Sequence, residues 1–337
     1  MKEALARPDS QQWMLAMIEE ITRLEARNSW EYVYPPTNAN LISARFVYNL
    51  KGNNTPYCAQ LVAQGYKQVE GLDYNFDNIF APVARLKSVC AMCAIAAIKD
   101  NELVQIDIKS AFLHGRMEPG EDVYLVPSKG ITLPGLKPGQ VLKLCACFYG
   151  LKQAGRQWYQ KLRDALSQIG FTRSQSDHAV FYRCLSPAEG SGTATIFCHV
   201  DDMGLKANKK YMPHFIRALK PHFELSEGRQ IHYLLGMHIT CDREKRNISF
   251  SQSAYINCIL TRYRFDEVCT VTTPMDPNVS LSKEQCAITE RQQEEMKNKP
   301  YREALGALMY ASVGTRLDMP YTVSTLVKFS QNPGPTH

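Results

Sequence analysis

The stretch ATIFCHVDDM, residues 194–203, is an apolar segment that runs directly into two adjacent carboxylates, Asp201 and Asp202. Its β-branched and aromatic residues predict a strand that ends at these carboxylates. A second apolar segment, LVQIDI at 103–108, predicts another short strand and places Asp107 near its end. A carboxylate at the end of a buried strand is rigidly held yet exposed at the sheet edge, which suits a metal ligand.

These three aspartates have two interpretations. Phosphoryl transfer from a nucleotide needs cations, and two metal ions roughly 3.5–4 Å apart can bind both the attacking and the leaving oxygen. Carboxylate oxygens are hard ligands that select Mg²⁺. Asp107 and Asp201 are far apart in the sequence, so only the fold can unite them. The alternative is that Asp201 and Asp202 form a polar hairpin turn, where aspartate is common.

Helices and strands are both expected around these two segments. Apolar residues at helical spacing predict helices over 10–27, 86–99, 156–169, 211–219 and 253–264. Alternating segments separated by turn residues predict hairpins over 44–65 and 233–252. Residues 270–300 are polar and are expected to be a linker, followed by two short helices. Because regular βαβ alternation is missing, we expect an α+β fold with antiparallel strands.

Composition limits the class of protein. A chain of 337 residues should form two or three subdomains, and its 45% hydrophobic and 21% charged residues are ordinary for a globular protein. The net charge of +6 is compatible with a nucleic-acid partner but is weak evidence alone. Eleven cysteines without a signal peptide favour an intracellular protein with reduced thiols. Cys90 and Cys93 lie in an apolar run and are expected in the core rather than at zinc.

Motifs in a fixed order cover nearly the whole chain. They are WMLAMIEEITRLEARNSWEYV (13–33), AQLVAQGYKQVEGLDYNFDNIFAPVARL (59–86), QIDIKSAFLHG (105–115), CFYGLKQAGRQWYQKL (147–162), HVDDM (199–203), YLLGMHI with SQSAYI (233–256) and YREALGALMYASVGTRLDMPY (301–321). In this order they resemble the reverse transcriptases of copia-type LTR retrotransposons. The resemblance implies an RNA-directed DNA polymerase domain of a Pol polyprotein, with two Mg²⁺ ions as cofactors. Its expected partners are an RNA template, a DNA primer and deoxynucleoside triphosphates, and no membrane.

The resemblance also implies a palm-fingers-thumb polymerase fold with a central antiparallel palm sheet. Its expected regions are an N-terminal helical segment at 1–28, a fingers-like region at 29–100, a palm with the primer-grip hairpin at 101–252, and a thumb-like or connection region at 253–337. RNase H and integrase regions are expected in a full-length polyprotein, outside this chain.

Catalytic roles follow from the resemblance at matching positions. Asp107 and Asp201 match the metal-binding aspartates, and Asp202 matches the third carboxylate. Because neighbouring strand residues point to opposite faces, we expect Asp202 to contact a metal less directly than Asp201. The carbonyl of Ile108 is a further candidate ligand.

The nucleotide site is expected around an aromatic side chain. Phe112 matches the residue under the sugar of the incoming nucleotide, where a ring collides with a ribose 2′-OH; the alternative is a core phenylalanine. Tyr149, Gly150 and Gln153 match the segment beside the nucleotide and template. Lys152 is a candidate phosphate contact, although an isolated charge is more often a solvated surface residue.

Candidate nucleic-acid contacts lie in two segments. Arg156 is a candidate phosphate contact, with the same solvated alternative. Trp158 is expected in the core rather than as a platform for base stacking. Gly236 and Met237 match the turn that grips the primer.

The sequence departs from the family at several positions. Cys58, Ala59 and Gln60 stand where the family usually has Lys-Ala-Arg, and both cations near the triphosphate are lost. His199 replaces the tyrosine before the aspartates. Gly155 replaces a proline, so this segment is expected to be looser.

Two functions therefore compete: an active polymerase, and a weakened or inactive relic that still binds nucleic acid. Cys58 and Gln60 favour the relic, whereas Asp107, Asp201 and Asp202 favour the enzyme. Weak nucleotide binding is expected unless Lys51 or Lys67 replaces the lost cations. A third hypothesis, another palm-fold nucleotidyl transferase such as a cyclase, leaves the fingers-like segment and LKQAGRQW unexplained.

Overall fold

The computed structural model describes residues 8–50, 57–127, 133–200, 202–225 and 228–337. Two compact units divide the chain. The first comprises Met1–Met92 and Asn101–Gln230, and the second comprises Cys93–Asp100 and Ile231–His337. Each unit is described by itself.

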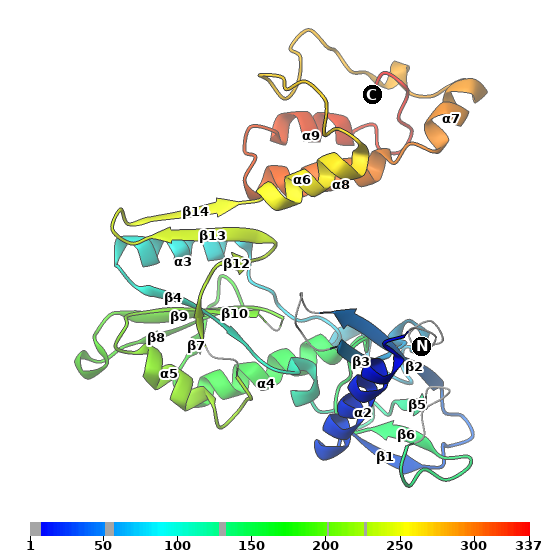
Figure 1. Cartoon of the computed structure of the whole chain (residues 1–337), viewed down its shortest axis with the longest axis vertical. Coiled ribbons are helices and arrows are strands. Elements are labelled where there is room, and N and C mark those ends of the chain that lie inside the picture. The colour runs from blue at the N-terminus through cyan, green and yellow to red at the C-terminus, as the bar shows by residue number, and fades with distance from the viewer. Residues whose placement is uncertain (1–7, 51–56, 128–132, 201, 226–227) are drawn as a thin grey trace. The chain divides into compact units, whose positions relative to one another are not determined.

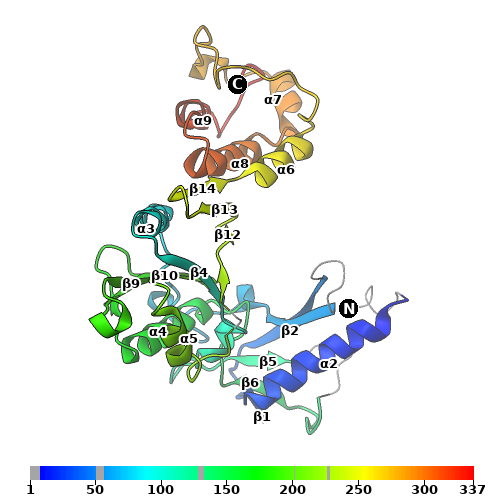
Figure 2. The same cartoon turned by 60° about the vertical axis from the view of Figure 1, so that its left-hand side comes forward.

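The N-terminal part of the first unit is a helix packed on a five-stranded sheet (Figures 1 and 2). The sheet order is β1-β6-β5-β2-β3, with bounds Trp30–Val33, Val141–Leu144, Tyr124–Val126, Leu41–Leu50 and Tyr57–Ala63. Helix α2, Ser10–Ala26, buries Trp13, Met17, Ile21 and Leu24, the residues whose spacing predicted it. The predicted hairpin at 44–65 is confirmed by the antiparallel pairing of β2 with β3.

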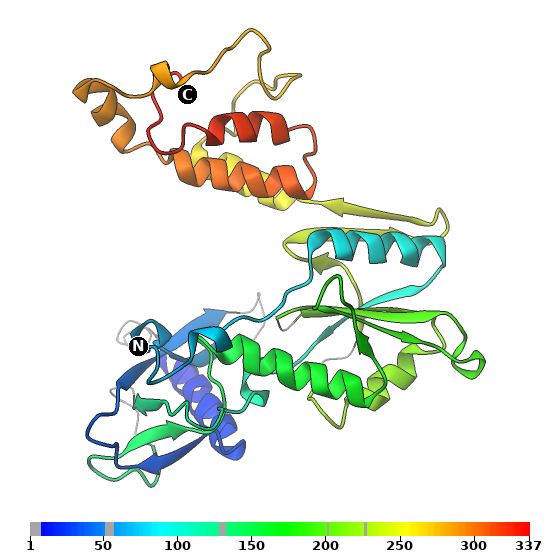
Figure 3. The ribbon, with the colours of Figure 1, turned by 180° about the vertical axis from the view of Figure 1, so that it is seen from behind.

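The second part of this unit is a six-stranded antiparallel sheet that carries the aspartates. Its order is β11-β4-β10-β9-β8-β7, with bounds Arg229–Gln230, Glu102–Asp107, Asp202–Ala207, Thr193–His199, Val180–Cys184 and Thr172–Arg173. Helices α4, Ala154–Gln168, and α5, Met212–Leu219, contribute their apolar residues to the core of this sheet. Figure 3 shows both helices on one face of it.

Helix α4 illustrates how the sequence sets an element. Trp158, Leu162 and Leu166 recur at helical spacing and are at most 2% exposed. Gly170 ends the helical segment with a φ of +87°, a left-handed conformation that glycine adopts without steric cost. The helix begins at Ala154, two residues earlier than expected, so Gly155 lies in its first turn rather than in a loose segment.

The second unit combines a three-stranded antiparallel sheet with helices. The sheet order is β12-β13-β14, with bounds Tyr233–Leu234, Met237–Asp242 and Asn247–Ser251. The helices are α6, Ser253–Tyr263; α7, Glu290–Lys297; α8, Tyr301–Gly314; and α9, Pro320–Val327. Helix α3, Leu86–Ile98, spans the boundary between the units in sequence.

The expected linker at 270–300 is wrong in part, because α7 lies within it. Thr289 and Gln292 form a reciprocal capping box at the start of α7. No residue of this helix is buried, so its sequence carries no periodic apolar pattern from which a helix could be predicted.

The fold-class prediction is confirmed: helices combine with mainly antiparallel sheets. The parallel pairing of β2 with β5 is an exception. The predicted region boundaries stay predictions. Within the described ranges, no helix is both long and apolar enough to cross a membrane.

Candidate active site

Two of the three predicted aspartates lie opposite each other on neighbouring strands. Asp107 ends β4, Asp202 begins β10, and the two residues are direct antiparallel partners. Direct partners point to the same face of a sheet, with Cβ atoms roughly 4.5–5.5 Å apart. The adjacent pair, Ile106 and Met203, is buried at 0% and 1% exposure, which anchors the register. The sheet thus presents two carboxylates side by side at its edge.

Asp202 is further oriented by its own neighbours. Its Oδ1 accepts a hydrogen bond of 3.0 Å from Nε2 of Gln105, which stands two residues before Asp107 on the same strand. Asp107 is exposed, whereas Asp202 is half-buried. Like charges directly opposite each other destabilise a strand pair. A bound cation would remove this repulsion, so the donor set fits a divalent metal that prefers oxygen ligands.

The third aspartate, Asp201, lies outside the described residues. Among the residues that are described, no three His, Cys, Asp or Glu side chains are placed together to hold a metal. Val200, immediately before Asp201, has a φ of +58°, which is rare for a β-branched residue. His199 is the cross-strand partner of Asp202 in β9. The chain therefore reverses direction between His199 and Asp202.

Backbone contacts hold the segment that follows Asp107 against the residues that follow α5. Ile108 is 2% exposed and forms an isolated antiparallel bridge with Leu225. The backbone N–H of Lys109 donates to the carbonyl of Glu224 at 3.0 Å. These contacts fix the backbone, including the Ile108 carbonyl proposed as a ligand.

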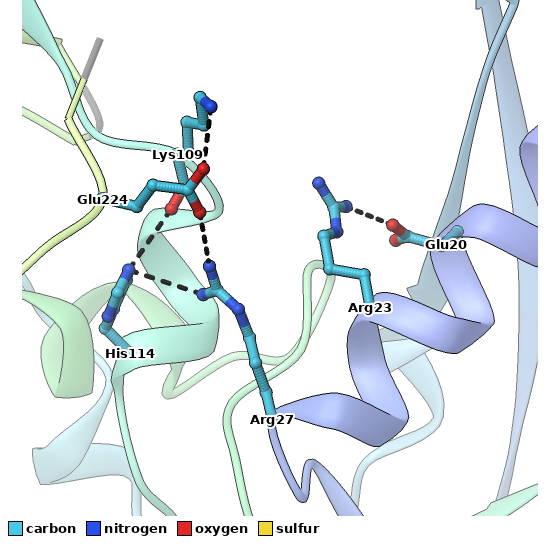
Figure 4. A network of polar contacts seen from close by, with 6 residues as sticks. All are labelled: Glu20, Arg23, Arg27, Lys109, His114 and Glu224. Atoms are coloured by element: carbon cyan, nitrogen blue, oxygen red, sulfur yellow. Dashed lines mark hydrogen bonds and ion pairs between the residues drawn. The ribbon is translucent and has the colours of Figure 1, made fainter.

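Side-chain ion pairs and hydrogen bonds strengthen the contact between these two segments (Figure 4). Glu224 pairs with Lys109 at 2.7 Å and with Arg27, at the end of α2, at 3.3 Å. The hydrogen bond from Lys109 lowers the pKa of Glu224. His114 lies within 3.5 Å of Arg27, and its pKa is lowered by burial and by the Arg27 charge. Exposed pairs of this kind stabilise by roughly 0.2–1 kcal/mol each, so their main effect is positional.

Phe112 and Tyr149, both predicted at the nucleotide site, are in contact. Phe112 lies in the short helix η3, Ala111–His114. The two rings meet edge to face, with centroids 4.9 Å apart and an interplanar angle of 84°. Both residues are half-buried, so each combines a packed side with an accessible one.

Gly150 is required by its surroundings. Its φ is +88°, and a Cβ there would lie 2.2 Å from the carbonyl oxygen of Ala63. A Cβ at Gly65 would in turn lie 1.9 Å from the carbonyl oxygen of Gly150. Both contacts are far too short for a side chain, so the loop after Tyr149 packs directly on the backbone that follows β3.

The buried side chain of Gln153 stabilises the loop that contains Gly150 through hydrogen bonds. It is fully buried, its Nε2 donates to the carbonyl of Asp73 at 3.0 Å, and its Oε1 accepts from Nε2 of Gln68 at 2.9 Å. Oε1 of Gln68 accepts the backbone N–H of Lys152 at 2.8 Å. Nζ of Lys152 donates to the hydroxyl of Tyr74 at 2.9 Å. These contacts add a scaffolding role to the nucleotide contacts predicted for both residues.

The remaining predicted positions on α4 differ in burial. Arg156 donates from Nη1 to the carbonyl of Asp77 at 3.2 Å. Trp158 is 2% exposed, which confirms it as a core residue. Its Nε1 donates to the carbonyl of Val200 at 2.7 Å.

The residues of β3 that differ from the family pattern lie on both faces of the strand. Ala59 is buried, whereas Cys58 and Gln60 are half-buried on the opposite face of the strand. Arg45 of β2 pairs with Val62, which shares the face of Cys58 and Gln60. This exposed cation is a candidate replacement for the lost charges, and no sequence motif points to it. The cross-strand register, which the sequence does not reveal, is what identifies it.

The predicted primer-grip residues belong to the second unit. Leu234 and Met237 are partners, so Leu235 and Gly236 form a two-residue turn. Gly236 has a φ of +73°, and Met237 is 2% exposed. The hydroxyl of Tyr310, from α8, donates to the carbonyl of Leu235 and fixes the turn.

Comparisons with known proteins agree along the chain. A family model described as reverse transcriptase (RNA-dependent DNA polymerase) matches residues 27–277. The chain is 33% identical over 342 residues to the retrovirus-related Pol polyprotein from transposon TNT 1-94 of Nicotiana tabacum, covering 100% of this chain and 25% of that protein. It is 32% identical over 334 residues to the retrovirus-related Pol polyprotein from transposon RE1 of Arabidopsis thaliana, and the match covers 97% of this chain and 22% of that protein. The chain thus spans about a quarter of the length of these relatives.

A solved structure is also similar. The foamy viral protease-reverse transcriptase dRH in complex with ds DNA is 11% identical and aligns with a TM-score of 0.47 over 96% of this chain and 45% of that one.

Proposed function

The chain belongs to the reverse transcriptase (RNA-dependent DNA polymerase) family, as the reverse-transcriptase domain of a copia-type retrotransposon Pol polyprotein, and from that premise we propose that it copies RNA into DNA. The membership confirms the resemblance found in the sequence. The observation that supports activity is the direct pairing of Asp107 with Asp202 on one face of the sheet.

The proposed metal site comprises Asp107, Asp201, Asp202 and the carbonyl of Ile108. Two Mg²⁺ ions, when bound, would activate the primer 3′-OH and stabilise the charge that develops on the phosphates. The strands hold the carboxylates so that little reorganisation is needed when the ions bind. The fixed backbone at Ile108 serves the same purpose.

The proposed nucleotide site begins at Phe112, shortly after Asp107 in the sequence. Phe112 would lie under the deoxyribose, with Tyr149 supporting its ring edge to face. Gly150 and Lys152 would line the nucleotide site, where Gly150 lets the loop pack on the backbone of β3. Gln153, predicted to contact the nucleotide, is fully buried and would instead keep this loop in place. Excluding a 2′-OH by shape would favour deoxynucleotides.

The proposed partners are an RNA template and a DNA primer. Arg156 would meet a backbone phosphate, and Gly236 with Met237 would support the primer terminus through the turn fixed by Tyr310. We place the protein inside the cell, in a cytoplasmic particle or the nucleus, because its cysteines suit a reducing compartment.

Primer extension on an RNA template tests the proposed activity. Asp107→Asn and Asp202→Asn should each abolish extension while binding of an RNA–DNA duplex and thermal unfolding stay close to the parent chain, because each removes one metal-binding charge. Asp164→Asn is a matched control, since Asp164 is an exposed carboxylate paired with Arg163. Near-parental extension by Asp202→Asn would contradict the proposal.

A second candidate function, a weakened copy that still binds nucleic acid, is favoured by one observation. Cys58 and Gln60 place no cation on the face of β3 that adjoins the Gly150 loop. Of the substitutes considered, Lys51 lies outside the described residues, and Nζ of Lys67 donates to Ser43 at 3.2 Å.

The double reversion Cys58→Lys with Gln60→Arg separates the two candidates. Charge-assisted hydrogen bonds contribute about 1.5–3 kcal/mol each, so in a weakened copy the two restored cations should lower the KM for the nucleotide by about two to four orders of magnitude. An unchanged KM with full activity would show that the parent chain binds the triphosphate by other means. Failure of both forms to extend would support the relic and direct attention to His199.

A further inference from the structure

A hydrogen bond joins the indole of Trp158 to the backbone of Val200. Nε1 of Trp158 donates to the Val200 carbonyl at 2.7 Å, although the two residues belong to α4 and to the turn after β9. Val200 precedes Asp201 in the sequence and follows His199, the β9 partner of Asp202, which in turn pairs with Asp107. The bond therefore ends at the turn that carries the predicted metal ligands.

The donor of this bond is firmly held. Trp158 is 2% exposed, and its ring packs edge to face against Phe223 with centroids 5.2 Å apart. Leu162, one turn further along α4, is 1% exposed in the same core. A buried ring that is fixed on several sides presents its N–H in one direction.

The acceptor needs such support. Val200 has a φ of +58°, and a β-branched residue in this region pays a steric cost that the surrounding structure must offset. A hydrogen bond to its carbonyl favours the observed peptide orientation over alternatives. Val200 is exposed, so packing of its own side chain contributes little.

We propose that Trp158 is a positioning residue of the metal site: its indole N–H holds the Val200 carbonyl in the conformation that keeps Asp202 opposite Asp107. The proposal rests on the proposed function for the identity of the ligand, a divalent cation. Trp158 itself touches neither metal nor substrate.

The chain contains a matched control. Trp13, in α2, is 5% exposed, and its Nε1 is buried without a hydrogen-bond partner among the described residues. Trp158→Phe and Trp13→Phe therefore make the same change in two buried sites, but only the first removes a hydrogen bond.

Binding of Mn²⁺ to the full chain, followed by electron paramagnetic resonance, gives a readout independent of activity. Mn²⁺ prefers the same oxygen ligands as Mg²⁺. Trp158→Phe should raise the Mn²⁺ dissociation constant at least tenfold, and Trp13→Phe should leave it within twofold. Hydrogen exchange of the backbone amides in β9 and β10 should accelerate in the first variant alone.

Val200→Gly tests the mechanism, because glycine adopts a positive φ without steric cost. In that background Trp158→Phe should raise the Mn²⁺ dissociation constant less than threefold. Should Trp158→Phe not fold, the site-specific benzothiophene isostere of Trp158, which replaces the N–H by sulfur at similar volume, makes the same comparison.

Unchanged Mn²⁺ affinity together with unchanged amide exchange would overturn the positioning role. A parent chain that binds Mn²⁺ but never extends a primer would refute the proposed activity, while the comparison of the two variants would still decide the role of Trp158. A parent chain that binds no Mn²⁺ would overturn both.

Discussion

Replacing Gly155 by alanine should stabilise the protein. Gly155 lies in the first turn of α4, where its backbone is helical rather than left-handed. A Cβ there would lie 3.6 Å from the Cβ of Ala81, an ordinary van der Waals contact. The added methyl group would enter a cavity of about 30 Å³ bordered by Trp158 and Val200.

The magnitude follows from two contributions. Glycine costs roughly 0.5–1 kcal/mol relative to alanine within a helix, and the cost is smaller in the first turn. Burying one methyl group contributes up to about 0.8 kcal/mol. We expect a gain of about 1 kcal/mol in the free energy of unfolding, which for a unit of this size raises the Tm by roughly 2–4 °C.

Urea unfolding measures the gain. The midpoint of Gly155→Ala should rise at an unchanged dependence on denaturant. Gly150→Ala is the contrasting variant, because a φ of +88° and a Cβ 2.2 Å from the Ala63 carbonyl oxygen should destabilise it by more than about 2 kcal/mol. A lower midpoint for Gly155→Ala would refute the reasoning, since it would mean that the space beside Ala81 is not open.

Three further predictions concern selectivity, affinity and pH. Phe112→Ala should lower the ratio of kcat/KM for deoxy over ribo substrates at least tenfold, about 1.4 kcal/mol, and an unchanged ratio would make Phe112 a core residue only. Arg45→Ala should raise KM for the nucleotide about tenfold and Lys67→Ala should not; equal effects in steady-state extension would exclude Arg45 as the substitute cation. Burial raises the pKa of Asp177, but hydrogen bonds from Ser88 and two backbone N–H groups outweigh it and the net pKa is lowered. The ionised Asp177 carboxylate therefore stabilises the folded state above the unfolded pKa near 3.9, and this contribution is lost as the pH falls through the folded pKa. The urea midpoints of Asp177→Asn and the parent should differ at pH 7 and converge in acid. A constant difference between the midpoints down to pH 2 would contradict this prediction.

Elements with an apolar face were predictable because burial leaves a periodic signature. Trp13, Met17, Ile21 and Leu24 predicted α2 and are buried in it. Helix α7 was missed because it buries none of its residues, and only the local Thr289 capping box marks its start.

The residues proposed for the site come from the sequence, whereas their geometry could not be predicted from it. Alternation along one strand predicts that Asp202 contacts a metal less directly than Asp201, and this stays a prediction; what the sequence did not reveal is the pairing of Asp202 with Asp107. That register depends on buried pairs such as Ile106 with Met203, which lie far apart in sequence. For the same reason the sequence did not reveal that the amide of Gln153 is engaged inside the protein.

The mutual contact of Gly65 and Gly150 has a consequence for the evolution of this chain. A side chain at Gly65 would collide with the carbonyl oxygen of Gly150, and one at Gly150 would collide with the carbonyl oxygen of Ala63, so at either position the obstacle is main chain that no rotamer change can move. A compensating substitution at the second position is unavailable, because both positions already carry the smallest residue. In a saturation library selected for folded protein, both codons should stay glycine while the neighbouring, exposed Tyr66 diversifies.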